Sequence, residues 1–204
     1  MIIEACVETF NEAVLAEKNG ADRLELCSRL DLDGLTPDKD LIANTVQELN
    51  IPVKVMIRPR SGNFIYSKPE IEEMKESIRL CKKLNVMGVV FGILTEDYHL
   101  DLQIINSLSK LAYPMEVTIH KAIDQTTDIF KSVLELTEIE YVNSILSSGG
   151  NSTAIEGKNT LMKMISLAKD KISIIAAGKI TKSNLFEVHR LVGANEYHGR
   201  KIVG

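Results

Sequence analysis

The sequence lacks the features that mark membrane proteins, secreted proteins and nucleic-acid-binding proteins. No run of about 18 apolar residues occurs, so we expect no membrane span. The first residues form no basic leader and already include Glu4, so we expect no secretory signal. The formal net charge of -4 at pH 7 argues against a surface that binds nucleic acid.

Cysteine is scarce, and its spacing excludes a disulfide framework. The chain has three cysteines, an odd number at irregular intervals, so we expect a reducing cytoplasm. With 204 residues, 45% hydrophobic and 25% charged, the chain is typical of soluble globular proteins and long enough to bury a substantial core. No linker or low-complexity segment interrupts it, so we predict a single domain over residues 1–204.

A regular alternation of strand and helix patterns runs along the whole chain. Strand patterns are predicted at 2–7, 22–27, 52–57, 86–91, 115–120, 141–146, 171–176 and 195–198. Helix patterns separate them, for example over 69–84, 101–111, 153–169 and 182–191. Eight such units of about 25 residues predict an α/β fold, a (β/α)8 barrel of the TIM type. We expect a short final strand and a reduced or missing last helix. A doubly wound open sheet is the alternative.

Side chains alternate across a strand, and here the alternation directs polar residues into the barrel. A typical barrel interior contains Val, Ile and Leu. Buried charges need partners or a ligand, so this set favours an interior that handles a ligand, with a structural ion-pair network as the alternative. The residues predicted to face inward are Glu4, Cys6, Glu25, Cys27, Lys54, Arg58, Glu116, Thr118, His120, Glu196 and His198.

Two of the cysteines, Cys6 and Cys27, close the first two predicted strands on the same side. Neighbouring strands lie roughly 4.8 Å apart, so one metal ion can reach both sulfurs. Thiolates favour Cu(I), and a two-ligand set suits a linear monovalent ion better than zinc, which prefers four ligands. Packing residues and a disulfide remain alternatives for the pair. Cys81 continues an apolar helix stripe, so we assign it to the core.

Several loops that follow strands carry residues suited to anions. Arg58 and Arg60 follow the third strand, where they are placed to bind an anion or pair with the interior carboxylates. Gly-rich turns at 147–150 and 177–179 lead to helix N-termini, which is where barrels bind phosphate. Such turns are also ordinary connections between a strand and a helix.

Two histidines at strand ends are candidates for a chemical role. His120 and Asp124 lie four residues apart after the fifth strand and suit a general acid and base. His198 closes the eighth strand, where we expect it to join Glu4 and Glu25 in binding a ligand. A histidine in this position is often only a hydrogen-bonding residue.

Six ordered segments of the chain resemble the CutC copper homeostasis proteins. They are Cys6-Val7, GADRLELCS at 20–28, GLTP at 34–37, 55–66 with its Arg, Gly, Phe and Tyr residues, GVVFG at 88–92 and SGG at 148–150. The resemblance extends over nearly the whole length. It implies a (β/α)8 barrel, a cytoplasmic setting and a role in copper tolerance or handling. It also implies Cu(I) binding by two cysteines, which correspond to Cys6 and Cys27, but no established reaction.

We therefore predict a cytoplasmic copper homeostasis protein of the CutC type that binds Cu(I) through two thiolates, with Glu4, Glu25 and Arg58 as the surrounding polar shell. The expected partners are a copper ion and other copies of the same chain, and neither nucleic acid nor a membrane. The alternative is a TIM-barrel enzyme acting on a small anionic or phosphorylated metabolite, with the two arginines holding the anion and His120 with Asp124 moving the proton. A barrel that only assembles with itself is a third hypothesis.

Overall fold

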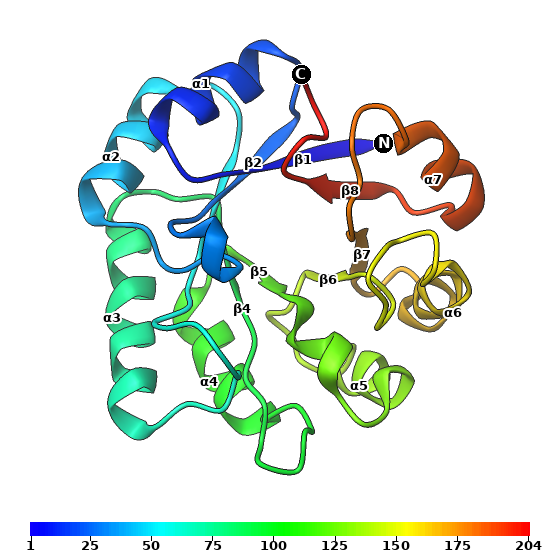
Figure 1. The fold of residues 1–204 in the computed structure, drawn as a ribbon. Coiled ribbons are helices and arrows are strands. Elements are labelled where there is room, and N and C mark those ends of the chain that lie inside the picture. The colour runs from blue at the N-terminus through cyan, green and yellow to red at the C-terminus, as the bar shows by residue number, and fades with distance from the viewer.

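The computed structural model describes all 204 residues and shows a closed barrel of eight parallel strands (Figure 1). Each strand pairs with the next in sequence, and β1 closes the ring by pairing with β8. The predicted TIM barrel is confirmed, and the open-sheet alternative is wrong. The strands are β1 (Ile2–Val7), β2 (Arg23–Leu26), β3 (Val53–Met56), β4 (Gly88–Phe91), β5 (Glu116–Ile119), β6 (Ser144–Ser147), β7 (Ser173–Ala176) and β8 (Glu196–Gly199).

Seven α-helices surround the strands, and no eighth helix follows β8, as predicted (Figure 1). They are α1 (Phe10–Lys18), α2 (Lys39–Glu48), α3 (Lys68–Lys83), α4 (Leu102–Ala112), α5 (Ile129–Leu136), α6 (Lys158–Ala168) and α7 (Leu185–Val192). Two 3-10 turns, η1 (Leu30–Leu32) and η2 (Lys121–Gln125), follow β2 and β5. The helix predicted from 153 begins only at 158. None of the helices combines the length and the apolar character that a membrane crossing needs.

The longest helix, α3, shows how local sequence sets an element. A capping box between Ser67 and Glu70 satisfies the first free amides, and Pro69 fits the first turn. Its buried residues Ile71, Met74, Ile78 and Cys81 follow a helical spacing and face the barrel. Cys81 is therefore a core residue, as predicted.

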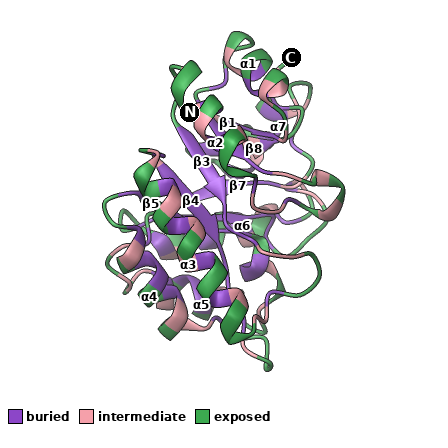
Figure 2. Ribbon diagram, turned by 90° about the vertical axis from the view of Figure 1, so that its left-hand side faces the viewer, coloured by how far each residue is buried: buried purple, intermediate pink, exposed green.

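The apolar core lies between the strands and the helices. Outward-facing strand residues such as Val55, Val89 and Val117 pack against buried helix faces in a cluster of 48 residues. Figure 2 shows the same division, with buried strands inside and exposed surfaces on the outer faces of the helices. Because the other face of each strand points to the barrel axis, the polar residues are concentrated inside the barrel.

Candidate functional site

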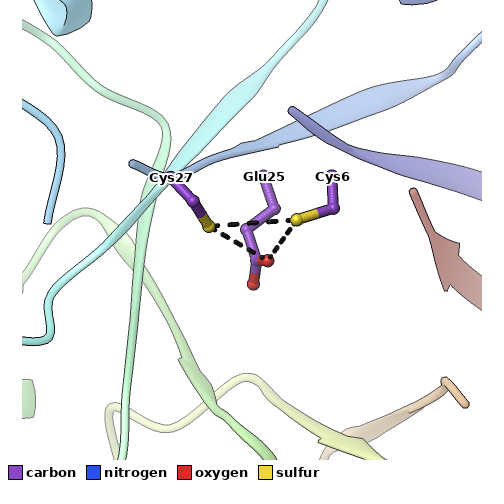
Figure 3. Close-up of side chains that lie close together, drawn as sticks. All are labelled: Cys6, Glu25 and Cys27. Atoms are coloured by element: carbon purple, nitrogen blue, oxygen red, sulfur yellow. Dashed lines mark hydrogen bonds between the residues drawn. The ribbon is translucent and has the colours of Figure 1, made fainter. Parts of the chain in front are cut away.

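The sulfur atoms of Cys6 and Cys27 lie 3.9 Å apart at the C-terminal ends of β1 and β2 (Figure 3). The carboxyl group of Glu25 points between them. Its Oε2 atom is 3.3 Å from Cys6 Sγ and 3.5 Å from Cys27 Sγ. All three side chains are buried. We call these three residues the sulfur site.

Strand register and one glycine position these groups. Cys6 of β1 is the partner of Glu25 in β2, so the two side chains leave neighbouring strands at the same level. Cys27 follows Glu25 by two residues and therefore lies on the same face. Gly34 has φ +84°, and a Cβ there would lie 3.2 Å from Cys27 Sγ, so the loop approaches the sulfur closely only because this residue is glycine.

A chain of charged groups extends from the sulfur site into the barrel. The Nε2 atom of His198 lies 3.7 Å from Glu25 Oε2, and its Nδ1 is 2.8 Å from Glu4 Oε1. Arg23 donates from Nε to Glu4 Oε2 at 2.5 Å and from Nη2 to Glu196 Oε2 at 2.6 Å. The predicted inward positions of the three glutamates and of His198 are confirmed, and Arg23 and His198 supply the opposite charges.

These contacts separate the pKa values of the two thiols. The hydrogen bond from Cys27 lowers the pKa of Cys6 to about 5 in spite of burial, with further help from His198. The same interaction raises the pKa of Cys27 well above its usual value, and burial adds to the effect. Burial raises the pKa of Glu25 to about 8. Burial disfavours charge on His198, but Glu25 and Cys6 outweigh it and raise the pKa of His198. The contact between the two sulfurs therefore favours a thiolate at Cys6 and a thiol at Cys27.

The lower part of the barrel interior is a structural network around Lys54. Its Nζ donates to Thr118 Oγ1 at 3.0 Å and to Ser144 Oγ at 3.4 Å, and it pairs with Glu116 Oε2 at 3.3 Å. The Glu116 side chain is 47% exposed, at the N-terminal end of the barrel. The alternative of a structural ion-pair network therefore applies at the N-terminal end of the barrel interior, while the sulfur site lies at the C-terminal end.

The two candidate arginines occupy different places. Arg58 lines the cavity above the sulfur site, where its terminal nitrogens donate to three backbone carbonyls at 2.9–3.1 Å and its Nε has no partner. Arg60 does not line this cavity. It pairs with Glu70 at 2.5 Å and donates to loop carbonyls. Only Arg58 is thus available to a molecule in the cavity.

His120 is a neutral, buried residue of the cavity wall. Its Nδ1 accepts the Ala122 amide at 3.1 Å and caps η2, while its Nε2 has no partner. Burial and the nearby Arg58 charge lower the pKa of His120 to about 3. A Cβ at Gly92 would lie 2.7 Å from the His120 ring, so glycine creates the space for this ring.

Asp124 organises the turn after β6. Its carboxylate accepts hydrogen bonds from Ser147 Oγ at 2.5 Å, from both Ser148 N and Ser148 Oγ, and from Gly150 N. The amides that the Gly-rich turn was expected to offer to a phosphate are thus bound by a carboxylate of the chain itself. Asp124 and His120 line one cavity, but they bind different partners and no hydrogen bond joins them.

The sulfur site opens into a cavity of about 520 Å³ at the C-terminal end of the barrel. Cys6, Glu25, Cys27 and His198 line its floor, and the segments after β2, β3, β5, β6, β7 and β8 form its walls. This is the end at which TIM-barrel enzymes place their active sites. The cavity is the candidate functional site.

The model of the CutC family matches residues 1–203. The chain belongs to the CutC family. The copper homeostasis protein cutC homolog of Homo sapiens is 42% identical over 197 residues, which cover 97% of this chain and 72% of that protein. The family protein CutC of Histophilus somni is 38% identical over 198 residues, covering 97% and 81%.

Solved structures agree with this assignment. The crystal structure of a CutC protein from Streptococcus agalactiae superimposes with a TM-score of 0.94 and 30% identity, covering all of both chains. A deoxyribose phosphate aldolase from Aeropyrum pernix has a TM-score of 0.71 at 14% identity, covering 98% of this chain and 86% of its own. The aldolase shares the fold alone.

Sequence reasoning missed the apolar surroundings of this CutC sulfur site. Met56 and Val90 are buried against the two cysteines, and Leu30 packs on the same cluster. Met56 lies two residues from Lys54 and from Arg58, so strand alternation alone was sufficient to place its thioether inside the barrel. Leu30 belongs to η1, a loop position for which the strand pattern carries no signal.

Proposed function

We propose that this CutC protein binds Cu(I) through the thiolates of Cys6 and Cys27, and that this binding serves copper homeostasis. The observation that carries the proposal is the pair of buried sulfurs, 3.9 Å apart, at the floor of an open cavity. The relatives described above are named for copper homeostasis, which supports the same role here.

The ligand set suits Cu(I) in number and in chemistry. Thiolates are soft ligands, which Cu(I) prefers. Metal–thiolate bonds of about 2.3 Å put the sulfurs of a linear site about 4.6 Å apart, so metal binding needs the pair to open by less than about 1 Å. The ring nitrogens of His198 face Glu4 and Glu25, which leaves the two sulfurs as the accessible ligands.

The alternatives for the cysteine pair explain less of this geometry. None of the three cysteines forms a disulfide. As packing residues they do fit the apolar cluster, but packing needs no carboxyl group between the sulfurs. Glu25 lies there with its Oε1 buried and without a partner, a costly arrangement for a residue that only packs. Zinc would need Glu25 and His198 as further ligands.

The geometry does not favour the enzyme alternative in the form that the sequence suggested. That hypothesis used Arg60 to hold an anion and His120 with Asp124 to move a proton. Arg60 lies outside the cavity, the Asp124 carboxylate is surrounded by donors, and the low pKa of His120 leaves it neutral.

We propose a cytoplasmic location, since free buried thiols suit a reducing compartment. Assembly of several copies of the chain stays a prediction, which sedimentation analysis can test.

The proposal is tested by an anaerobic Cu(I) titration against a competing chelator. We expect one tight site per chain. Cys6→Ser and Cys27→Ser should each weaken it more than about 100-fold, because changes merely next to a ligand already cost roughly 10–100-fold. Cys81→Ser is the matched control, since that thiol lies in the α3 core and should leave affinity unchanged. An affinity for Cu(I) that is unchanged in both Cys6→Ser and Cys27→Ser would contradict the proposal.

A further inference from the structure

The cavity above the sulfur site is larger than copper binding requires. An ion bound by two thiolates occupies only the space between the sulfurs. The cavity has about 520 Å³, within the roughly 300–1,000 Å³ typical of sites for small organic molecules. Something larger than the ion therefore fits beside Cys6 and Cys27.

The cavity wall carries three cations that have no carboxylate partner. Arg58 is only 4% exposed, and its guanidinium binds neutral backbone carbonyls instead of a counter-ion. Buried charges normally have an opposite partner. Lys121, which opens η2, and Lys179, which follows β7, also line the cavity, and neither side chain forms an ion pair. An anion in the cavity would neutralise all three.

The acids of the cavity do not cancel this charge. Asp124 is enclosed by four donors, and Glu25 belongs to the sulfur site, which leaves Asp33 on the rim. The chain as a whole has a net charge of -4, so the excess of cations over free acids in the cavity is a local feature. Clefts lined by one sign of charge concentrate ligands of the opposite sign.

The backbone around Lys179 supports a role for this side chain. Lys179 has φ +54°, a left-handed conformation that a residue with a side chain rarely adopts. Gly178 before it packs against the backbone of residues 153 and 154 and the Ser148 side chain, where any Cβ would clash. Strained, well-packed positions of this kind are concentrated at functional sites.

We propose that the cavity receives Cu(I) as a complex with a small thiol that carries carboxylates, and that Arg58, Lys121 and Lys179 bind those carboxylates while the metal passes to Cys6 and Cys27. This inference rests on the proposed copper function. Each copper–sulfur bond to the carrier is replaced by one to a cysteine, and the cysteine proton passes to the departing carrier thiolate. Copper remains Cu(I) throughout, so no oxidant or reductant takes part.

The test compares two copper donors by stopped-flow mixing. Cu(I) is presented either with glutathione, an anionic thiol, or with acetonitrile, an uncharged ligand. The double variant Lys121→Gln/Lys179→Gln should take up copper from glutathione at least about tenfold more slowly at low ionic strength, and from acetonitrile at the wild-type rate. Added salt should slow the wild type with glutathione only.

A matched double variant controls for net charge. Lys83 and Lys110 are exposed in the last turns of α3 and α4, at the opposite end of the barrel, and neither pairs with an acid. Lys83→Gln/Lys110→Gln should behave as the wild type with both donors. Equal rates for all variants with both donors would overturn the inference and leave the copper site intact. No uptake by the wild type from either donor would instead refute the copper function.

A copper-free measurement tests the carboxylate site by itself. S-methylglutathione keeps the carboxylates of the carrier but has no thiol. Calorimetry with the metal-free protein should give a Kd of roughly 1 mM for the wild type and for Lys83→Gln/Lys110→Gln, weakened at least about fivefold in Lys121→Gln/Lys179→Gln. Absence of binding to the wild type at about 20 mM, or equal binding by both variants, would contradict the proposed site.

Discussion

The affinity for Cu(I) is expected to rise about tenfold for each pH unit between pH 6 and pH 8. Cys6 has a pKa of about 5 and is already a thiolate, whereas Cys27, with its raised pKa, still holds its proton. Cu(I) replaces that one proton with an equal charge, so the neighbouring groups keep theirs. One proton released per ion corresponds to about 1.4 kcal/mol per pH unit.

The number of protons released when Cu(I) binds distinguishes a site with one thiolate and one thiol from a site with two thiols. If both thiols were protonated in the free protein, the affinity would rise about a hundredfold per unit, because two protons would leave. The assay is competition with a chelator of known protonation behaviour at pH 6, 7 and 8. Calorimetry in buffers of different ionisation enthalpy counts the released protons independently. A slope near zero or near two would refute the unequal pKa values derived from the Cys6–Cys27 contact.

Three further predictions concern the residues around the site. Between pH 6.5 and pH 5 the wild type should lose about 2 kcal/mol more unfolding free energy than His120→Asn in urea titrations, because His120 gains a proton only when unfolded, whereas the variant keeps the η2 cap and has no titrating ring. Arg23→Met should cost about 3–5 kcal/mol, because it leaves the buried Glu196 without a partner and Glu4 with His198 alone, and a similar loss in the exposed-pair control Lys171→Met would contradict this. Asp124→Asn should speed hydrogen exchange of the amides in the β6–α6 turn without changing the affinity for copper. An exchange rate equal to that of the wild type would contradict the role of Asp124 in holding this turn.

Much of the fold follows from periodic patterns of apolar and polar residues, which depend only on residues close together in the sequence. The strand–helix alternation gives the barrel, and the alternation of side chains places Glu4, Cys6 and Glu25 inside it. Every strand after β1 was predicted to start one to three residues too early, because buried apolar residues such as Val86 and Ile172 precede the segment that pairs in the sheet. The α6 helix starts late, since Gly157 packs its backbone against Ser148 in the preceding turn, a tertiary contact without a sequence signal.

The residues of the candidate site likewise fall into two groups, those placed by strand register and those whose roles depend on contacts between loops. Cys6 and Cys27 were identified because both lie at strand ends, where register fixes their separation. The roles of Arg60 and Asp124 depend on which loop groups approach them, and spacing along the chain does not determine that. Asp124 lies four residues after His120 in sequence, yet its partners come from the turn after β6.

The copper X-ray absorption spectrum of the Cu(I)-loaded wild-type protein reports the ligands of the metal. We expect two sulfur scatterers per copper and no nitrogen or oxygen ligand, because Cys6 and Cys27 supply the whole ligand set. A shell that includes nitrogen from His198 or oxygen from Glu25, or that contains fewer than two sulfurs, would contradict it.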